Sequence, residues 1–188
     1  MKTTVIIQAR MSSSRLPGKI LKKINNLSVI ELIVKRLKKS KSIDDIIVAT
    51  SNIKENKPLL NILKKKKIKF FCGSEKDVLS RFYLAAKKNK SNIVVRITGD
   101  CPLADPLIVD EFVNDFKKSK VDYISNCNPW TYPDGLDVEV FSFDLLKEVN
   151  KKAKKKHRKN GGVLLSFLRN NKKYKIKNKK GIFGNNFK

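Results

Sequence analysis

Residues 5 to 19 of the chain read Val5-Ile6-Ile7-Gln8-Ala9-Arg10-Met11-Ser12-Ser13-Ser14-Arg15-Leu16-Pro17-Gly18-Lys19. The stretch begins as a short apolar run rich in β-branched residues, which is typical of a buried parallel strand. It continues as a polar loop with three serines, two arginines and a lysine. Hydroxyls, backbone N–H groups and fixed cations in one loop after a buried strand can hold a polyphosphate. We therefore expect a strand followed by a phosphate-binding loop; the alternative is an ordinary basic surface loop.

Two widespread phosphate-binding loops do not account for this stretch. The Walker A loop requires a glycine at the position of Ser13 and a serine or threonine at the position of Ile20. The dinucleotide fingerprint requires three spaced glycines, which the stretch lacks. A phosphate loop at this place therefore belongs to another class.

The loop resembles the opening motif of the cytidylyltransferases that make CMP-activated sugars, the acylneuraminate and 3-deoxy-manno-octulosonate enzymes. That motif reads Ala-Arg-x-x-Ser-x-Arg-Leu-Pro-Gly-Lys, and the matching residues are Ala9, Arg10, Ser13, Arg15, Leu16, Pro17, Gly18 and Lys19. Gln8 and Met11 are similar to one branch of the family, the spore coat polysaccharide biosynthesis protein F-like cytidylyltransferases. The resemblance implies that Ala9, Arg10, Ser13, Arg15 and Lys19 bind the nucleotide, with Arg10 and Lys19 also catalytic.

Length and composition indicate one soluble globular domain. The chain has 188 residues, of which 40% are hydrophobic, and it contains no run of 18 apolar residues. Its start lacks the apolar region of a signal peptide. The three cysteines are odd in number and widely spaced, which favours reduced thiols over a disulfide frame. We expect a cytoplasmic protein without a membrane span.

The net charge of +26 raises a second interpretation, a basic protein that binds polyanions. The excess is nearly all lysine, in runs such as 64–67 and 154–156. Aromatic residues that would stack on bases do not alternate with these runs. The pattern argues against nucleic acid as a partner, and polyanion binding remains as the weaker alternative.

Apolar patterns along the chain predict alternating strands and helices. We expect strands over residues 3–8, 45–50, 68–72, 92–98, 121–125 and 137–141, and helices over 28–39, 58–67, 77–88, 143–155 and from 106 onward. Repeated β-α units imply an α/β fold, a Rossmann-like three-layer α/β/α arrangement with a mainly parallel sheet. By resemblance it is of the nucleotide-diphospho-sugar transferase type. Ligands then bind beyond the carboxyl ends of the strands.

The character of the sequence changes near residue 150. We expect residues 1–150 to form the nucleotidyltransferase α/β domain and 151–188 a basic, shortened C-terminal extension of that domain. Gly161-Gly162 would break any helix there, and we expect an arm or short returning elements with poor order near the end. Relatives usually carry an acidic motif in this region that supplies a second metal ligand. Here no aspartate or glutamate follows Glu148, so only Asp137 or Glu139 would remain to replace that ligand.

Asp100 is the first candidate for metal binding. It directly follows an apolar run, in Thr98-Gly99-Asp100-Cys101-Pro102-Leu103, and a carboxylate suits Mg²⁺. The alternative is an aspartate that caps the next helix, a role that Asp105 fits better. Gly-Asp-x-Pro-Leu after the central strand is similar to the family's metal-binding motif. The resemblance therefore implies that Asp100 is a catalytic Mg²⁺ ligand.

Two further motifs resemble the family. Around Gly73, the resemblance implies that Ser74 and Arg81 contact the nucleotide, although Ser74 with Asp77 also reads as a simple helix cap. Residues 132–139 match the Tyr-Pro-Asp-Gly-Leu-Asp-Val-Glu motif of the spore-coat-type branch throughout. Asp137 and Glu139 share one face of a strand, where they either bind a sugar or a second cation or form a solvated face. The expected sugar-binding residues are Tyr132, Asp134, Asp137 and Glu139.

Together these features imply nucleotidyl transfer: a sugar oxygen attacks the α-phosphate of CTP and pyrophosphate leaves. The implied cofactor is Mg²⁺, and the implied partners are CTP and a sugar, with a homodimer as one assembly that the resemblance allows. Surface or spore-coat polysaccharide biosynthesis is the expected setting. The alternative within the family is a truncated, weak or inactive nucleotide-binding or glycosyltransferase-like member.

Overall fold

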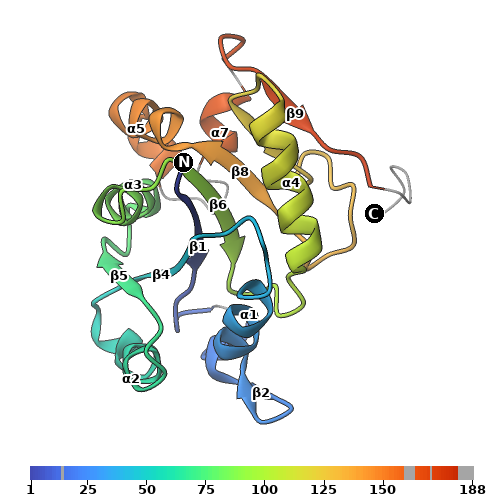
Figure 1. Cartoon of the computed structure of the whole chain (residues 1–188). Helices are drawn as coiled ribbons and strands as arrows, with labels where there is room; N and C mark the ends of the chain where they lie inside the picture. Colours follow the sequence, from blue (N-terminus) through green and yellow to red (C-terminus); the bar gives the residue numbers. More distant parts are fainter. Residues whose placement is uncertain (14, 159–163, 170, 182–188) are drawn as a thin grey trace.

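The computed structural model describes residues 1–13, 15–158, 164–169 and 171–181. Their main feature is a seven-stranded sheet of order β5-β4-β1-β6-β8-β7-β9 (Figure 1). In chain order the strands are β1 (Thr3–Gln8), β4 (Asp45–Ser51), β5 (Phe70–Gly73), β6 (Ile93–Thr98), β7 (Tyr123–Ser125), β8 (Glu139–Ser142) and β9 (Ile176–Asn178). A separate hairpin pairs β2 (Lys23–Ile24) with β3 (Leu27–Ser28).

The sheet is parallel from β5 through β6. β1 pairs in parallel with both β4 and β6, and β4 pairs in parallel with β5. β8 runs antiparallel to β6 and β7, whereas β9 is parallel to β7. The carboxyl ends of β1, β4, β5 and β6 therefore lie at the same edge as the amino end of β8.

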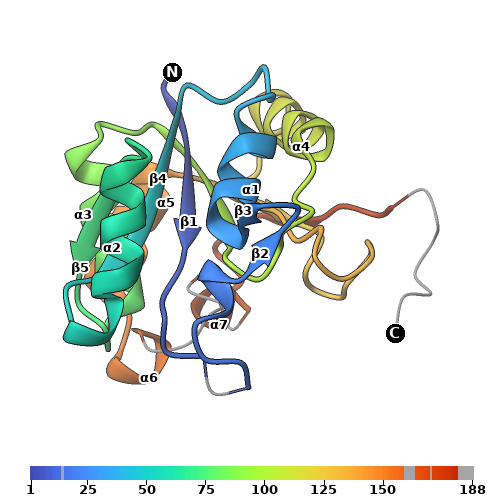
Figure 2. The same ribbon diagram turned by 90° about the horizontal axis from the view of Figure 1, so that it is seen from below.

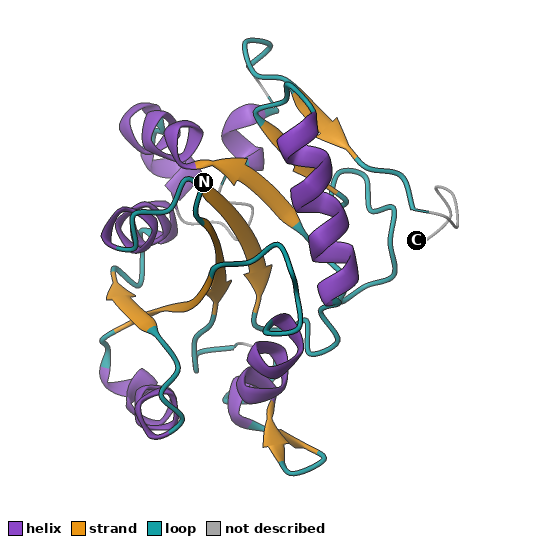
Figure 3. Ribbon diagram, viewed as in Figure 1, coloured by secondary structure: helices purple, strands orange, loops and turns teal. Residues whose placement is uncertain are grey.

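Helices connect the strands, and α1, α3, α4 and α5 begin at capping side chains that the sequence provides. They are α1 (Val29–Leu37), α2 (Lys57–Lys65), α3 (Val78–Lys88), α4 (Pro106–Lys118), α5 (Phe143–Lys152) and the short α6 (Lys155–Arg158) and α7 (Leu165–Leu168). Ser28 and Glu31 form a capping box at α1. Asp77, Asp105 and Ser142 each accept a hydrogen bond from a backbone N–H in the first turn of α3, α4 and α5. Figure 3 shows the resulting alternation of helices and strands.

Two apolar cores lie between the sheet and its two layers of helices, one on each face of the sheet. On one face of the sheet α1, α2 and α4 pack against alternate strand residues such as Val5, Ile7 and Val95. On the other face α3 and α5 pack against Ile6 and Val94. Figure 2 shows α1 and α4 on one side of β1, and α3 and α5 on the other. The predicted three-layer α/β/α arrangement with a mainly parallel sheet is confirmed.

The predicted strands and helices are all found, most of them within two residues of the expected ends. Strand β8 begins at Glu139 rather than at Asp137, and α5 ends at Lys152 rather than at residue 155. The β2–β3 hairpin, with Asn25 and Asn26 at positive φ, was not expected. The expected break at Gly161-Gly162 and the expected poor order near the end concern residues 159–163 and 182–188, which lie outside the described residues.

The segment beyond residue 150 forms short elements that return to the sheet. β9 pairs with β7 from Ile176 to Asn178 and becomes the edge strand. Lys177 and Lys179 fix it to α4 through ion pairs with Asp115 at 2.8 and 3.0 Å. The division of the chain at residue 150 stays a prediction. In the described part of the chain, no helix combines the length and the apolar character that a bilayer crossing requires.

Candidate active site

The loop that follows β1 is folded by its own backbone and by one buried amide. The Met11 carbonyl accepts hydrogen bonds from the N–H groups of Ser13 and Gly18, both at 2.9 Å. Gly18 adopts a left-handed conformation with φ 70°, which glycine takes at little cost. The fully buried Asn56 accepts from Met11 N–H at 2.8 Å and donates to Ser51 Oγ at 2.7 Å. Asn56 therefore ties the loop to the end of β4.

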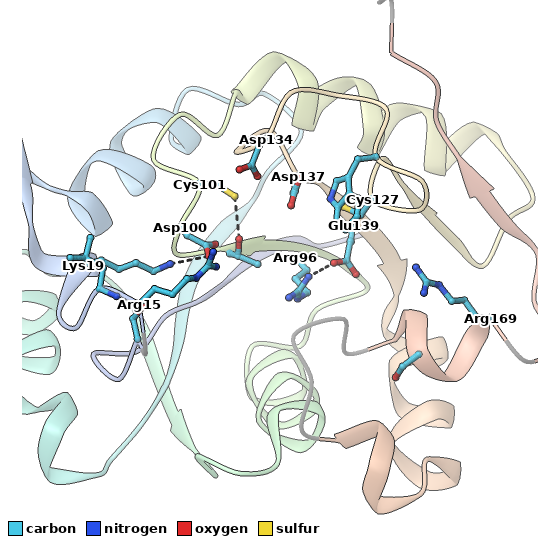
Figure 4. A pocket seen from close by; sticks show the side chains of 15 residues that line it. Arg15, Lys19, Arg96, Asp100, Cys101, Cys127, Asp134, Asp137, Glu139 and Arg169 are labelled. Carbon is cyan, nitrogen blue, oxygen red and sulfur yellow. Dashed lines mark hydrogen bonds and ion pairs between the residues drawn. The ribbon is translucent and has the colours of Figure 1, made fainter. Parts of the chain in front are cut away.

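The loop places its cations over the edge of the sheet. Lys19 Nζ lies 3.0 Å from Asp100 Oδ2, so the loop after β1 meets the loop after β6 (Figure 4). Arg10 Nη1 lies 3.4 Å from Glu75 Oε1, in the loop after β5. Arg15 is exposed. Ala9 is buried and part of the core.

The turn after β5 holds the loop rather than facing the cavity. The Glu75 carboxylate accepts from Ser51 Oγ at 2.6 Å and from Ser12 Oγ at 3.2 Å. Arg81 is 1% exposed, and its Nη1 donates to the Ser74 carbonyl at 2.6 Å. Ser74 Oγ accepts from the Asp77 N–H at 3.0 Å, as a capping residue does. Ser74 and Arg81 are thus outside the residues that line the main cavity.

A cavity of about 650 Å³ opens beside this loop. It is lined by Ser13, Arg15, Leu16, Lys19, Arg96, Thr98, Asp100, Cys101, Cys127, Trp130, Asp134, Asp137, Glu139, Ser166 and Arg169. A smaller cavity of about 260 Å³ adjoins it and is lined by Gln8, Arg10, Ser13, Arg15, Lys19, Ile20, Arg96, Thr98, Gly99 and Asp100. The structure therefore brings the predicted cation loop, Asp100 and the acidic part of the 132–139 motif to one place.

The cavity is basic at the loop, acidic in the middle and basic again at its far end. Figure 4 shows Asp134 and Asp137 on one wall, with Lys19 and Arg15 at one end and Arg169 at the other. Burial raises the pKa of Asp137, and the negative charges of Asp134 and Glu139 raise it further. Burial also works to raise the pKa of Asp100, but the Thr98 hydroxyl and the Lys19 ammonium outweigh it and lower that pKa.

Glu139 does not lie on a solvated strand face, so that alternative is wrong for this residue. Its side chain is 3% exposed and forms an ion pair with Arg96. Its other carboxylate oxygen accepts from Tyr123 Oη at 2.7 Å. Burial, together with the Glu139 charge, raises the pKa of Tyr123 well above its ordinary value, so the phenol remains a donor. Glu139 can be buried because Arg96 on β6 and Tyr123 on β7, the two strands that flank β8, satisfy its carboxylate.

The rest of the 132–139 motif forms the expected turn. The Leu136 N–H donates to the Pro133 carbonyl at 3.2 Å, and Gly135 has φ 91°. Tyr132 packs edge-on against Phe112 with ring centroids 5.8 Å apart, so the structure places it against the core beside α4. Asp134 and Asp137 are the members of the motif that reach the cavity wall, together with Glu139 at its floor.

The donor atoms of this cavity suit a magnesium ion. Mg²⁺ prefers oxygen ligands, is often bound by only one or two carboxylates, and takes its other ligands from water and substrate phosphates. Asp100 and Asp137 supply such carboxylates, and they are close enough for the Asp100 charge to raise the pKa of Asp137. Among the described residues no group of three or more ligating side chains forms a complete metal cage. The residues fit an ion that is shared with a bound phosphate.

Several lining residues were not expected from the sequence. Arg96 had a visible signal, since it interrupts the apolar run Ile93-Val94-Val95-Arg96-Ile97. Trp130 lies two residues before the 132–139 motif but was not predicted to line the site. Ser166 and Arg169 could not be placed here, because nothing local predicts that residues 164–169 return to this edge. Gly99 lines the smaller cavity, and glycine is required there because a Cβ would lie 2.9 Å from Ile20 and 3.0 Å from the Gln8 carbonyl. Asp105 was expected to cap α4, and it does.

Comparison with known proteins places the chain in a family. The sequence profile described as cytidylyltransferase matches residues 4–186. The chain belongs to the cytidylyltransferase family. An uncharacterised protein of Methanocaldococcus jannaschii is 43% identical to it over 159 residues, 85% of this chain and 64% of that protein. The spore coat polysaccharide biosynthesis protein SpsF of Bacillus subtilis is 33% identical over 150 residues, 78% of this chain and 61% of that protein.

A solved structure agrees with this membership. The cytidylyltransferase of Leptospira borgpetersenii superposes with a TM-score of 0.89 at 31% identity, over 97% of this chain and 77% of that one. The two curated relatives named above extend further, since the matched part covers only about three fifths of their length. The resemblance read from the phosphate loop is thereby confirmed at the level of the family and the fold.

Proposed function

We propose that this chain transfers CMP from CTP to a sugar oxygen and releases pyrophosphate, in polysaccharide biosynthesis. One observation carries the proposal: Lys19 Nζ and Asp100 Oδ2 lie 3.0 Å apart at the wall of one cavity, so the loop cation and the metal-binding candidate serve the same ligand. Membership of the cytidylyltransferase family supports CTP as the nucleotide. The name of the Bacillus subtilis relative supports the biosynthetic setting.

The phosphate loop would bind the triphosphate and stabilise the charge of the leaving pyrophosphate. Arg10, Arg15 and Lys19 supply fixed positive charge, and Ser13 supplies a hydroxyl, all at the wall of the smaller cavity. Such groups act by position and charge, because phosphoryl chemistry of this kind requires no covalent intermediate on the protein. Asn56 and Glu75 would keep the loop in its binding conformation through Met11, Ser12 and Arg10.

Asp100 and Asp137 would hold Mg²⁺ beside the phosphates. The ion, when bound, would neutralise phosphate charge and polarise the phosphorus–oxygen bond. Burial raises the pKa of Asp137, and the charges of Asp134 and Glu139 raise it further, so a divalent cation there would relieve the repulsion among these carboxylates. The Lys19 ammonium partly neutralises Asp100 until substrate arrives.

The acceptor sugar would lie between the acidic wall and the far end of the cavity. Asp134 and Asp137 can accept hydrogen bonds from sugar hydroxyls. Trp130 is 59% exposed and lines the cavity, so its ring can cover an apolar face of a sugar. Tyr132 would not contact the sugar; by packing on Phe112 it would hold the following turn, which carries Asp134, in position.

The test is pyrophosphate release with Mg²⁺, each of the four ribonucleoside triphosphates and a panel of acidic and amino sugars. We expect release with CTP and at least one sugar, and none with the other nucleotides. Release that does not discriminate between nucleotides would reject CMP transfer. Binding of CTP without release on any sugar would favour the alternative, a nucleotide-binding member of the family.

A further inference from the structure

Arg96 is a charged residue in a place where charge is costly. It lies in the middle of β6 between Val95 and Ile97, and it is 7% exposed. Removing a guanidinium from water costs several kcal/mol unless partners satisfy it. An apolar residue could occupy this position of β6 without that cost, so the presence of the Arg96 guanidinium requires an explanation.

Residues of two neighbouring strands hold the guanidinium in one orientation. Its Nε and Nη2 donate to Gln8 Oε1 of β1, at 3.3 and 3.1 Å, and its Nη1 donates to Glu139 of β8. Glu139 is held in turn by the Tyr123 hydroxyl of β7 at 2.7 Å. The polar row Gln8–Arg96–Glu139–Tyr123 thus crosses four strands near the binding edge of the sheet.

These contacts leave part of the guanidinium available. An arginine carries five N–H groups, and three hydrogen bonds are formed, so two N–H groups have no partner among the described residues. Arg96 lines both the larger and the smaller cavity, and Figure 4 shows it between Lys19 and Arg15 of the phosphate loop on one side and Arg169 on the other. A side chain that is 8% exposed therefore directs free donors to the place where the two cavities meet (Figure 4).

We infer that Arg96 is a substrate-contacting residue that binds an anionic oxygen where the two cavities meet, and that Glu139 is its positioning residue. This rests on the proposed function, in which that place is where the transferred phosphate meets the acceptor. A fixed guanidinium there would stabilise the charge that develops on the phosphate during transfer. A carboxylate of the acceptor has the same hydrogen-bonding chemistry and is the other source of such an oxygen. Glu139 would then orient Arg96 instead of binding sugar directly.

The test compares Arg96→Lys with wild type. Lysine keeps a charge for Glu139 but lacks the planar fork that reaches Gln8 and the ligand. Arg36→Lys is the matched control, because Arg36 also pairs with a carboxylate, Asp105, yet lines neither cavity. Binding of cytidine, CMP, CTP and inorganic pyrophosphate is measured by calorimetry, with the Tm of each variant. Should Arg96→Lys fail to fold, the double variant Arg96→Met with Glu139→Gln removes both buried charges together.

We expect Arg96→Lys to weaken CTP and CMP binding by about 10- to 100-fold, with cytidine binding and Tm nearly unchanged. Unchanged CTP binding with a raised KM for the sugar would assign the oxygen to the acceptor and also support the site. Equal affinities and rates in both proteins, or a loss of cytidine binding in step with a lower Tm, would overturn the inference. A wild type that binds no CTP would reject the proposed function, and pyrophosphate binding would then test Arg96 alone. A wild type that binds neither CTP nor pyrophosphate would reject the proposed function and the role of Arg96 together.

Discussion

Lys19 Nζ and Asp100 Oδ2 lie 3.0 Å apart, although 81 positions separate the two residues in the chain. The contact joins the loop after β1 to the loop after β6, because these strands are parallel neighbours and end at the same edge. A cation and a carboxylate that both face one cavity form an ion pair, and under the proposed function Lys19 would become free for phosphate when a divalent cation binds Asp100. The predictions below follow from this arrangement.

Removal of a loop cation should weaken triphosphate binding. Lys19→Ala or Arg10→Ala should raise the Kd for CTP by about tenfold or more, since each removes a charge-assisted hydrogen bond. Lys65→Ala, at the end of α2 and away from the cavity, is the control and should change the Kd little. Calorimetric titration measures the Kd of all three variants. An equal loss of CTP affinity in the three would contradict the assignment of the loop after β1 to phosphate binding.

The buried amide of Asn56 should be needed for both stability and binding. Asn56→Ala leaves Met11 N–H and Ser51 Oγ without this partner, which should lower the free energy of unfolding by about 1–3 kcal/mol. The loop should also bind CTP less well, because its conformation is no longer fixed. Urea unfolding measures the first effect and titration the second; a loss of stability with unchanged CTP affinity would show that the loop orders itself without Asn56.

The raised pKa of Asp137 predicts a stability that depends on pH. Since the folded state holds the proton more tightly than the unfolded chain, stability should fall as the pH rises from the ordinary value of 3.8 through the raised pKa. Asp137→Asn should therefore raise Tm at neutral pH, by about 2–4 °C for each kcal/mol gained, and bring no gain in acid. Thermal unfolding across this range is the measurement. A lower Tm at neutral pH would mean that the carboxylate is stabilising.

The edge strand β9 should depend on Asp115. The Lys177 ammonium, and then that of Lys179, lower the pKa of Asp115 against the effect of burial. The contribution of this carboxylate is therefore present above 3.8 and lost as the pH falls through the lowered pKa. Asp115→Asn should speed proteolysis after residue 170 at neutral pH while leaving the CTP affinity unchanged. Equal cleavage rates for wild type and variant at neutral pH would show that the ion pairs of Asp115 with Lys177 and Lys179 do not hold β9 in place.

The sequence predicted the elements that local patterns determine. Apolar runs predicted β1, β4 and β6. The polar loops that follow β1 and β6 predicted that Lys19 and Asp100 lie at one edge, because parallel strands end together. The nucleotide-binding role of Ser74 and Arg81 stays a prediction, since the Arg81 guanidinium donates to the Ser74 carbonyl and neither residue lines the main cavity. The position of Arg169 could not be predicted, since the return of residues 164–169 depends on contacts distant in the chain. The burial of Glu139 depends on Arg96, which pairs across strands.

The measurement that tests the central claim most directly is Mg²⁺-dependent pyrophosphate release with CTP and the sugar panel, in wild type and in Asp100→Asn side by side. We predict release that is selective for CTP in wild type and lost in the variant, with CTP still bound through the loop cations. Equal release by both proteins would contradict the role of Asp100 opposite Lys19, and with it the assignment of this cavity as the place of transfer.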